Sequence, residues 1–196
     1  MLALLLQERG LGGQGENIET RFERFAGERS PKADAARKLA QRISRMCHSG
    51  TGGQEPLSIG GLIATAYPDR IAKRRDNKGE KWISAMGRGL QLDAASLLAR
   101  EEWLAVADVQ GAASGARILS AAPLTEAEII GHFADRITQE EALSYDKNAD
   151  RVDARAQRRL GAIVLSEGRM EKPDQTAVAR ALLTAVREMG VGALPW

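Results

Sequence analysis

Apolar residues recur at intervals of three and four along the first third of the chain, which is the period of an amphipathic helix. Caps and breakers divide this part into separate helices: Asn17 or the pair Ser30-Pro31 can start a helix, and a glycine can end one. The expected helices lie at residues 2–7, 18–27, 31–49 and 56–67. In the third, the apolar face holds Ala36, Leu39, Ala40, Ile43 and Cys47.

Two glycine-rich stretches, residues 10–15 and 50–53, separate these helices. Neither ends in the Lys-Ser or Lys-Thr pair of a phosphate-binding loop, and neither lies between a strand and a helix. We interpret both as connecting loops, and they give no indication of a nucleotide site.

Beyond Pro68 the pattern changes to short apolar runs separated by turn sequences, which is typical of β-strands. The runs are residues 82–86, 103–109 and 116–120, and the last two predict a hairpin. Thr125, with Glu128 three positions later, has the form of a capping box. A short helix is therefore expected over residues 126–133.

Residues 143–166 fit two patterns. Polar and apolar residues alternate over residues 151–160, as in an exposed strand. The alternative is a helix, because apolar residues also recur there at helical spacing, namely Val152, Ala156, Leu160 and Val164. We favour strands, since residues 145–150 resemble a hairpin turn and residues 160–165 form an apolar run.

The chain closes with a predicted helix over residues 174–189, ended by Gly190. Helices, then short strands, then a helix is an α+β order of elements. The simplest architecture has two units with a boundary near residues 64–80.

Charge and cysteine content narrow the function. The 196 residues include 28 basic and 26 acidic ones, a net charge of only +2, so nucleic-acid binding would have to depend on local clusters. The single cysteine, Cys47, excludes an internal disulfide and a cysteine-based zinc site. The apolar run at residues 2–6 is too short for a signal peptide, and no run approaches the ~20 residues that span a bilayer. We expect a soluble, cytoplasmic protein with no membrane partner.

The sequence offers little that could catalyse a reaction. His48 and His132 have no further ligands at metal spacing, so we interpret them as ordinary histidines, with a general-base role left open. The adjacent acidic pairs at residues 101–102 and 140–141 would point in different directions in regular structure, which favours solvated charges.

Basic residues gather in two places. The first group falls within nineteen residues and comprises Arg70, Lys73, Arg74, Arg75, Lys78, Lys81 and Arg88. The second comprises Arg151, Arg155, Arg158, Arg159 and Arg169. Strand spacing would place Arg151, Arg155 and Arg159 on one face, together with Gln157, where they could contact backbone phosphates. In the alternative interpretation this face is solvated, and Asp150 and Asp153 even out its charge.

Four stretches of sequence resemble the HrpB family of bacterial DEAH-box-type ATP-dependent helicases. They are residues 61–75 (GLIATAYPDRIAKRR), 85–93 (AMGRGLQLD), 158–166 (RRLGAIVLS) and 190–196 (GVGALPW). Their order and rough spacing are those expected of that family. The first is also similar to the stretch that follows the helical ratchet domain in DEAH-box-type helicases. The resemblance covers residues 57–196, whereas the first fifty residues match only in helical character.

This resemblance implies an α+β fold in three parts. These are the end of a ratchet-like helical domain (residues 1–63), a small OB-like β-barrel (residues 64–166) and the helical start of a C-terminal region (residues 167–196). In the family, nucleotide hydrolysis belongs to two RecA-like motor domains, whose Walker lysine, acidic Mg²⁺ box and arginine finger are not found in this sequence. We therefore expect a non-catalytic piece, with ATP and Mg²⁺ as cofactors of the motor alone. It is also expected to begin inside a helical domain and to end before the family's C-terminal region is complete.

The resemblance also implies that the chain guides single-stranded nucleic acid, with RNA the first candidate, for its RecA-like motor domains. The expected backbone contacts are Arg70, Lys73, Arg74, Arg75, Lys81, Arg88, Arg155 and Arg159. Trp82 or Trp103 could stack on a base, although we favour core packing because both lie in apolar runs. The competing interpretation is a protein-interaction or regulatory module that docks on the motor domains or on another protein partner.

Overall fold

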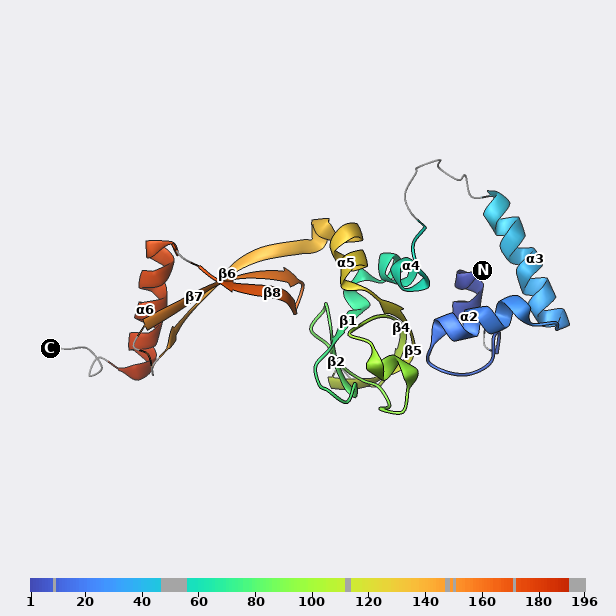
Figure 1. Ribbon diagram of the computed structural model, residues 1–196, viewed down its shortest axis with the longest axis horizontal. Helices are drawn as coiled ribbons and strands as arrows, with labels where there is room; N and C mark the ends of the chain where they lie inside the picture. Colours follow the sequence, from blue (N-terminus) through green and yellow to red (C-terminus); the bar gives the residue numbers. More distant parts are fainter. Residues whose placement is uncertain are drawn as a thin grey trace. The chain divides into compact units, whose positions relative to one another are not determined.

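The computed structural model describes residues 1–8, 10–46, 56–111, 114–146, 149, 151–170 and 172–190 (Figure 1). Some features of the sequence analysis lie outside these residues, namely Cys47, His48, the glycine-rich segment 50–53, Asp150 and the stretch after residue 190. The chain divides into two compact units, Met1–Ala134 and Asp135–Trp196.

Local hydrogen bonds determine where the helices of the first unit begin. After α1 (Leu2–Gln7), the Asn17 side chain caps α2 (Ile18–Gly27) by accepting a hydrogen bond from the backbone N–H of Glu19 at 2.9 Å. Thr125 and Glu128 form the predicted capping box of α5 (Glu126–His132). Both predicted starts are confirmed.

The helix predicted from Pro56 or Leu57 begins later, as α4 (Ile59–Ala66). Ser58 caps it, because its hydroxyl accepts a hydrogen bond from the backbone N–H of Gly61 at 2.9 Å. A proline two positions before the cap therefore lies outside the helix, even though proline is common in a first helical turn.

Helix α3 (Pro31–Met46) buries less of its apolar face than the pattern suggests. Ala33 and Ala40 are buried, but Leu39, Ile43 and Met46 are 37%, 45% and 73% exposed. The guanidinium of Arg37 donates to the backbone oxygens of Phe25 and Glu28 at 2.7 and 2.6 Å. These bonds connect α3 to the C-terminal end of α2, while Leu39, Ile43 and Met46 lie on the exposed side of α3.

A closed β-barrel forms the rest of the first unit. Its strands are β1 (Ile71–Arg74), β2 (Lys81–Ser84), β3 (Gly89–Gln91), β4 (Trp103–Gln110) and β5 (Ser114–Leu124), with 3-10 turns η1 (Pro68–Arg70) and η2 (Leu97–Arg100). The order around the barrel is β1-β2-β3-β5-β4; β4 returns antiparallel to β1, and β3 lies parallel to β5. This is an OB-like closure, and it confirms both the predicted fold class and the predicted β4–β5 hairpin.

Inward-facing side chains fill the barrel. The buried cluster includes Ala72, Trp82, Leu90, Leu104, Val106 and Ile118. Because successive residues of a strand face opposite sides, the residues between these positions face outward. The charged residues of β1 and β2 therefore lie on the outer wall or at the barrel ends.

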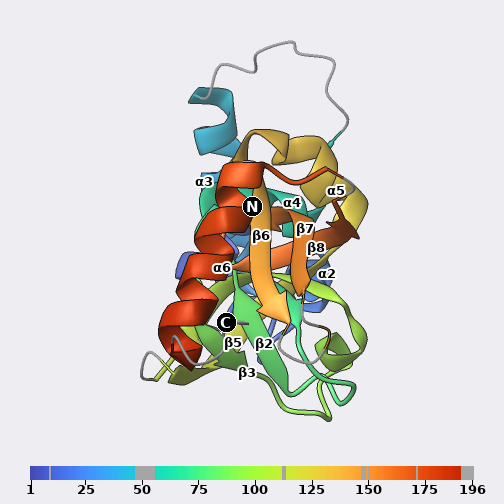
Figure 2. The ribbon, with the colours of Figure 1, turned by 90° about the vertical axis from the view of Figure 1, so that its left-hand side faces the viewer.

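The second unit is an antiparallel sheet with one helix. Its elements are η3 (Ala134–Arg136), β6 (Ile137–Asp146), β7 (Arg151–Leu160), β8 (Ile163–Arg169) and α6 (Gln175–Met189). The strand order is β6-β7-β8, and α6 packs along β6 and β7 (Figure 2). The strand interpretation of residues 151–160 is confirmed, and the helical alternative is not adopted.

The division between the two units differs from the expected boundary between residues 64–166 and residues 167–196. The barrel ends with β5, and β6–β8 pair only with one another, on the other side of the division after Ala134. Barrel closure explains this, because a closed barrel has no free edge to which a further strand could add.

Candidate nucleic-acid interface

The turn between β1 and β2 carries exposed basic side chains and is held by backbone and side-chain hydrogen bonds. Gly79 occupies φ +73°, a conformation that other residues rarely adopt, and it lies against the backbone of Ala99. The Asp76 carboxylate accepts a hydrogen bond from the backbone N–H of Glu80 at 3.0 Å, which stabilises the turn. The backbone N–H of Arg75 donates to the oxygen of Lys81 at 2.8 Å and joins the two strands.

Arg75, Lys78 and Lys81 form what we call the β1–β2 cationic face. All three are exposed, and within the described residues their side chains have no hydrogen bond, ion pair or ring contact. Lys81 lies opposite Gln91 of β3, and its backbone oxygen accepts from Arg75. Because neighbouring residues of a strand face opposite sides, Lys81 faces away from the side on which Trp82 is buried. The charges of these three side chains are therefore available to bind a ligand.

Lys73 and Arg74 are engaged in holding the barrel together. The Lys73 ammonium lies 3.7 Å from the carboxylate of Glu102 and 4.8 Å from the ring centre of Trp103. Arg74 donates to the backbone oxygens of Ala99 and Arg100 at 3.2 and 3.0 Å. Both keep their charge near the β1–β2 cationic face, but contact with a phosphate would compete with these interactions.

Arg70 and Arg88 lie at the opposite end of the barrel. Arg70 stacks over the ring of Tyr67 at 4.7 Å and donates to the oxygen of Ala107 at 2.7 Å, while Arg88 donates to the oxygen of Gly111 at 3.0 Å. With Met86 and neighbouring apolar residues they line a depression of about 150 Å³. The first basic group of the sequence is therefore split between two barrel ends.

The tryptophans are packed as core residues. Trp82 is 1% exposed and Trp103 is 2% exposed. The indole N–H of Trp82 donates to the oxygen of Gly79 at 2.8 Å, which ties the ring to the β1–β2 turn. Neither ring has a free face for a base, so the core-packing interpretation agrees with the structure.

The second basic group lies in the sheet of the second unit and is partly neutralised. Arg155 contacts Asp153 at 2.7 Å and Glu167 at 2.9 Å; these hydrogen bonds raise the pKa of Arg155, and the bond from Arg155 lowers the pKa of Asp153. Arg159 lies 3.6 Å from Glu140 and donates to Gln157 at 2.9 Å. Of the two aspartates in the alternative interpretation, Asp153 pairs with Arg155, and Asp150 lies outside the described residues. Arg151, Arg158 and Arg169 are exposed.

Two other kinds of site find no support in the described part of the chain. There, no group of three or more His, Cys, Asp or Glu side chains is placed to hold a metal ion. None of the helices there combines the length and apolar character needed to cross a bilayer.

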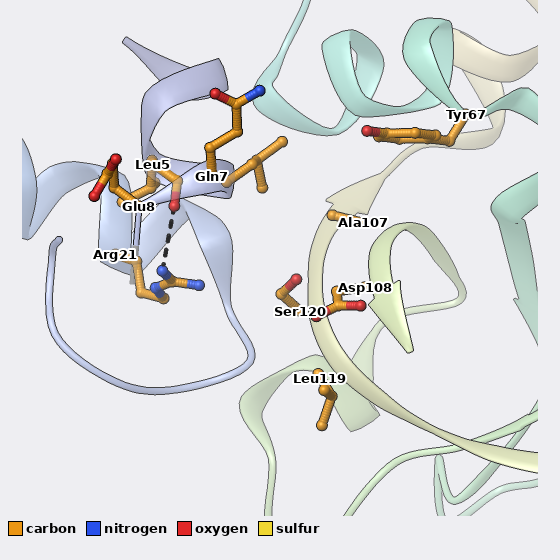
Figure 3. A pocket seen from close by; sticks show the side chains of 10 residues that line it. Leu5, Gln7, Glu8, Arg21, Tyr67, Ala107, Asp108, Leu119 and Ser120 are labelled. Carbon is orange, nitrogen blue, oxygen red and sulfur yellow. Dashed lines mark hydrogen bonds between the residues drawn. The ribbon is translucent and has the colours of Figure 1, made fainter. Parts of the chain in front are cut away.

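Sequence reasoning missed one group of polar side chains. Arg21, Asp108 and Ser120 line a hollow beside the barrel, shown in Figure 3. They come from α2, β4 and β5, and no short motif joins them. The one available signal was Asp108 itself, a charged residue inside an otherwise apolar strand.

No family model matches the chain. The ATP-dependent RNA helicase HrpB of Escherichia coli (strain K12) is 29% identical over 164 residues, which are 83% of this chain and 20% of that protein. The solved structure of the E. coli DExH-box NTPase HrpB matches 100% of this chain and 23% of its own, with 27% identity and a TM-score of 0.70. The chain is related to HrpB.

The predicted resemblance to the HrpB family is thereby confirmed. A second solved structure, that of the E. coli DEAH/RHA helicase HrpB, shares the fold with a TM-score of 0.68 at 23% identity. The chain spans about a fifth of the length of the curated HrpB, 20%. The similarity therefore concerns one part of HrpB rather than the whole of it.

Proposed function

We propose that this chain is a non-catalytic accessory part of an ATP-dependent RNA helicase, and that it holds the backbone of single-stranded RNA for the motor domains. The observation that carries the proposal is the β1–β2 cationic face, three exposed cations with no partner among the described residues. In OB-folds, the surface of strands 2 and 3 and the loop between strands 1 and 2 are the places where oligonucleotides bind. Relationship to a protein named an RNA helicase supports RNA as the strand.

The chemistry of this face suits a backbone rather than a base sequence. Arg75, Lys78 and Lys81 offer point charges and a guanidinium fork, and phosphates release counterions when they bind such groups. No aromatic ring is exposed beside them, because Trp82 and Trp103 are buried. Binding at this face should therefore depend strongly on salt and little on sequence.

Removal of the three charges should weaken RNA binding. In the variant carrying Arg75→Ala, Lys78→Ala and Lys81→Ala, the affinity of the full chain for a short single-stranded RNA should fall about tenfold or more at low salt. The slope of log affinity against log salt should flatten by about 2, because each phosphate contact to a single strand contributes ~0.7. Fluorescence anisotropy with a labelled strand at several salt concentrations measures both quantities.

A matched control removes three exposed cations elsewhere, with Arg151→Ala, Arg158→Ala and Arg169→Ala in the second unit. This control should leave affinity and slope nearly unchanged. An equal loss in both triple variants would mean that only overall charge matters, and no loss in the first would exclude the proposed face.

A protein-docking function is the second candidate, and helix α3 is the observation that favours it. Leu39, Ile43 and Met46 form an exposed apolar ridge, and Lys38, Arg42 and Arg45 form a cationic ridge beside it. A second copy of the same helix would be repelled by like charges, so the complementary surface is an apolar groove bordered by carboxylates on another protein segment.

Charge exchange tests this second candidate. A designed amphipathic peptide with leucines flanked by glutamates should bind the full chain, and Lys38→Glu, Arg42→Glu and Arg45→Glu together should abolish binding. A peptide with lysines in place of the glutamates should restore it, because the attraction is electrostatic. Titration calorimetry measures each pair. Binding that survives both charge reversal and Ile43→Ser would rule out docking through this helix.

A further inference from the structure

A hollow of about 460 Å³ lies between the first two helices and the outer wall of β4 and β5 (Figure 3). Its apolar walls include Leu5, Leu119 and the ring of Tyr67. Arg21 and Ser120 lie on opposite sides of it in Figure 3. This volume lies within the range of small-molecule sites, which combine apolar walls with a few polar groups that converge on the ligand.

Two of its polar side chains have hydrogen-bonding capacity that the described part of the chain does not use. Ser120 is 6% exposed as a residue, but its hydroxyl, which makes no hydrogen bond to another described residue, is still accessible. The Nε of Arg21 is inaccessible and has no acceptor, and the one bond of this guanidinium, from Nη2 to the oxygen of Leu5, is long at 3.5 Å. A ligand could not reach the inaccessible Nε, but it could bond the accessible Nη1 of Arg21 and the hydroxyl of Ser120. Small-molecule sites commonly combine such convergent polar groups with apolar walls.

A local irregularity of the sheet brings Asp108 to the same hollow. Val106 and Val109 both contact the barrel core, although they are three positions apart. The register between β4 and β5 shifts on both sides of Asp108, so this bulge places Asp108 on the outer wall, opposite Ser120. With strict alternation, Asp108 would have pointed with Val106 into the core. Its carboxylate has no ion pair or hydrogen bond among the described residues.

Tyr67 supplies a flat wall. The Arg70 guanidinium covers one side of the ring at 4.7 Å, and the side chain is 38% exposed and lines the hollow. Aromatic rings with an accessible surface are the usual partners of bases that have left the stack of single-stranded RNA.

We propose that this hollow binds one unstacked base of single-stranded RNA, and that it favours guanine. The proposal depends on the proposed function for its ligand class, but its site lies on β4 and β5 rather than on the β1–β2 cationic face. Guanine matches Arg21 and Asp108, two of the three charged residues that line the hollow; Glu8 is the third. Its N1–H and N2–H₂ can donate to the carboxylate of Asp108, while O6 and N7 can accept from Arg21. Adenine and cytosine would turn a ring nitrogen acceptor toward the carboxylate, and uracil has a single donor there.

The structure thus separates two kinds of contact. Lysines and an arginine on one wall of the barrel would bind phosphates without regard to sequence, and a carboxylate on another wall would distinguish one base from another. A base held in the hollow would also bond Nη1 of Arg21 and the hydroxyl of Ser120.

Guanosine and guanosine 5′-monophosphate are the probes, with the adenine, cytosine and uracil nucleosides as competitors and inorganic phosphate as a control for the anion alone. Titration of the full chain by calorimetry, or by NMR shifts of the residues around the hollow, should rank guanosine first. Asp108→Asn should lower its affinity about tenfold or more. Ser120→Ala should have a smaller effect, and the matched control Asp135→Asn, an exposed aspartate of the second unit, should have none. Circular dichroism of each variant establishes that the fold is retained.

The results distinguish this site from the proposed function. Loss of RNA affinity in the Arg75, Lys78 and Lys81 variant, with guanosine binding unchanged, supports both proposals. If that variant still bound RNA fully and also bound guanosine, the proposed function of the β1–β2 cationic face would be contradicted and the base site would be retained. Equal affinity for all four nucleosides, no change in Asp108→Asn, or binding of phosphate alone would overturn the base site.

Discussion

Replacement of Trp82 by alanine is expected to lower the free energy of unfolding of the first unit by about 3–5 kcal/mol. The side chain is 1% exposed and lies among Ala72, Leu90 and Leu104 inside the barrel. Its removal leaves a cavity that short strands joined in a closed ring cannot collapse around without losing their pairing. The loss should appear in denaturant unfolding followed by far-ultraviolet circular dichroism, which does not depend on the missing fluorophore.

Trp82→Phe is the matched variant. Phenylalanine keeps most of the apolar volume but cannot donate the hydrogen bond that the indole makes to the oxygen of Gly79 at 2.8 Å. We expect a cost of about 1–2 kcal/mol from that bond and the smaller ring. If Trp82→Ala instead left stability unchanged and lowered RNA affinity, the ring would be a stacking surface and its assignment to the core would be wrong.

The parts of this fold that could be predicted from sequence are those determined by neighbouring residues. Asn17, Thr125 and Gly190 mark helix ends because a cap needs only the next few backbone groups. The strand interpretation of residues 151–160 succeeded for a similar reason, because alternation along one segment is a local pattern, and β7 pairs antiparallel with β6, the strand before it.

Barrel closure could not be predicted in the same way. The strand β3 is three residues long and pairs with β5, more than twenty positions further along the chain, and no local pattern encodes that contact. For the same reason the sequence placed residues 137–166 with the barrel. Alternation shows that a segment is a strand, but it does not show which sheet the strand joins.

The candidate site also combines features that local sequence predicts with features that depend on distant contacts. Basic residues are visible in the sequence, but whether each is available depends on distant backbone oxygens, as Arg74 and its bonds to Ala99 and Arg100 illustrate. The hollow was invisible because Asp108 faces it only through a bulge, and a bulge shifts a strand by one residue without any motif. The sequence therefore predicts where the charged residues lie along the chain, but it does not predict which of them are bonded to other residues in the fold.

Alanine at Gly79 is expected to destabilise the first unit by about 2–5 kcal/mol. The φ of +73° would cost a residue with a side chain about 1–2 kcal/mol. A Cβ there would also lie 2.0 Å from the backbone oxygen of Ala99, so the turn or η2 must shift, which adds about 1–3 kcal/mol. The displaced oxygen also accepts from Arg74 at 3.2 Å, so this barrel end should loosen as a unit. Tryptophan fluorescence during denaturant unfolding measures the loss.

The control is Gly10→Ala, since Gly10 has a similar φ of +87° but nothing within 4 Å of the added Cβ. It should cost about 1–2 kcal/mol, the conformational part alone. Equal losses in the two variants would show that the approach to Ala99 contributes nothing. At a temperature where both remain folded, only Gly79→Ala should lower RNA affinity, because Arg75, Lys78 and Lys81 depend on this turn for their positions. RNA binding as strong as that of the unaltered chain would mean that a loosened turn presents the three charges equally well, and that the rigidity of the barrel rim is not what aligns them with a strand.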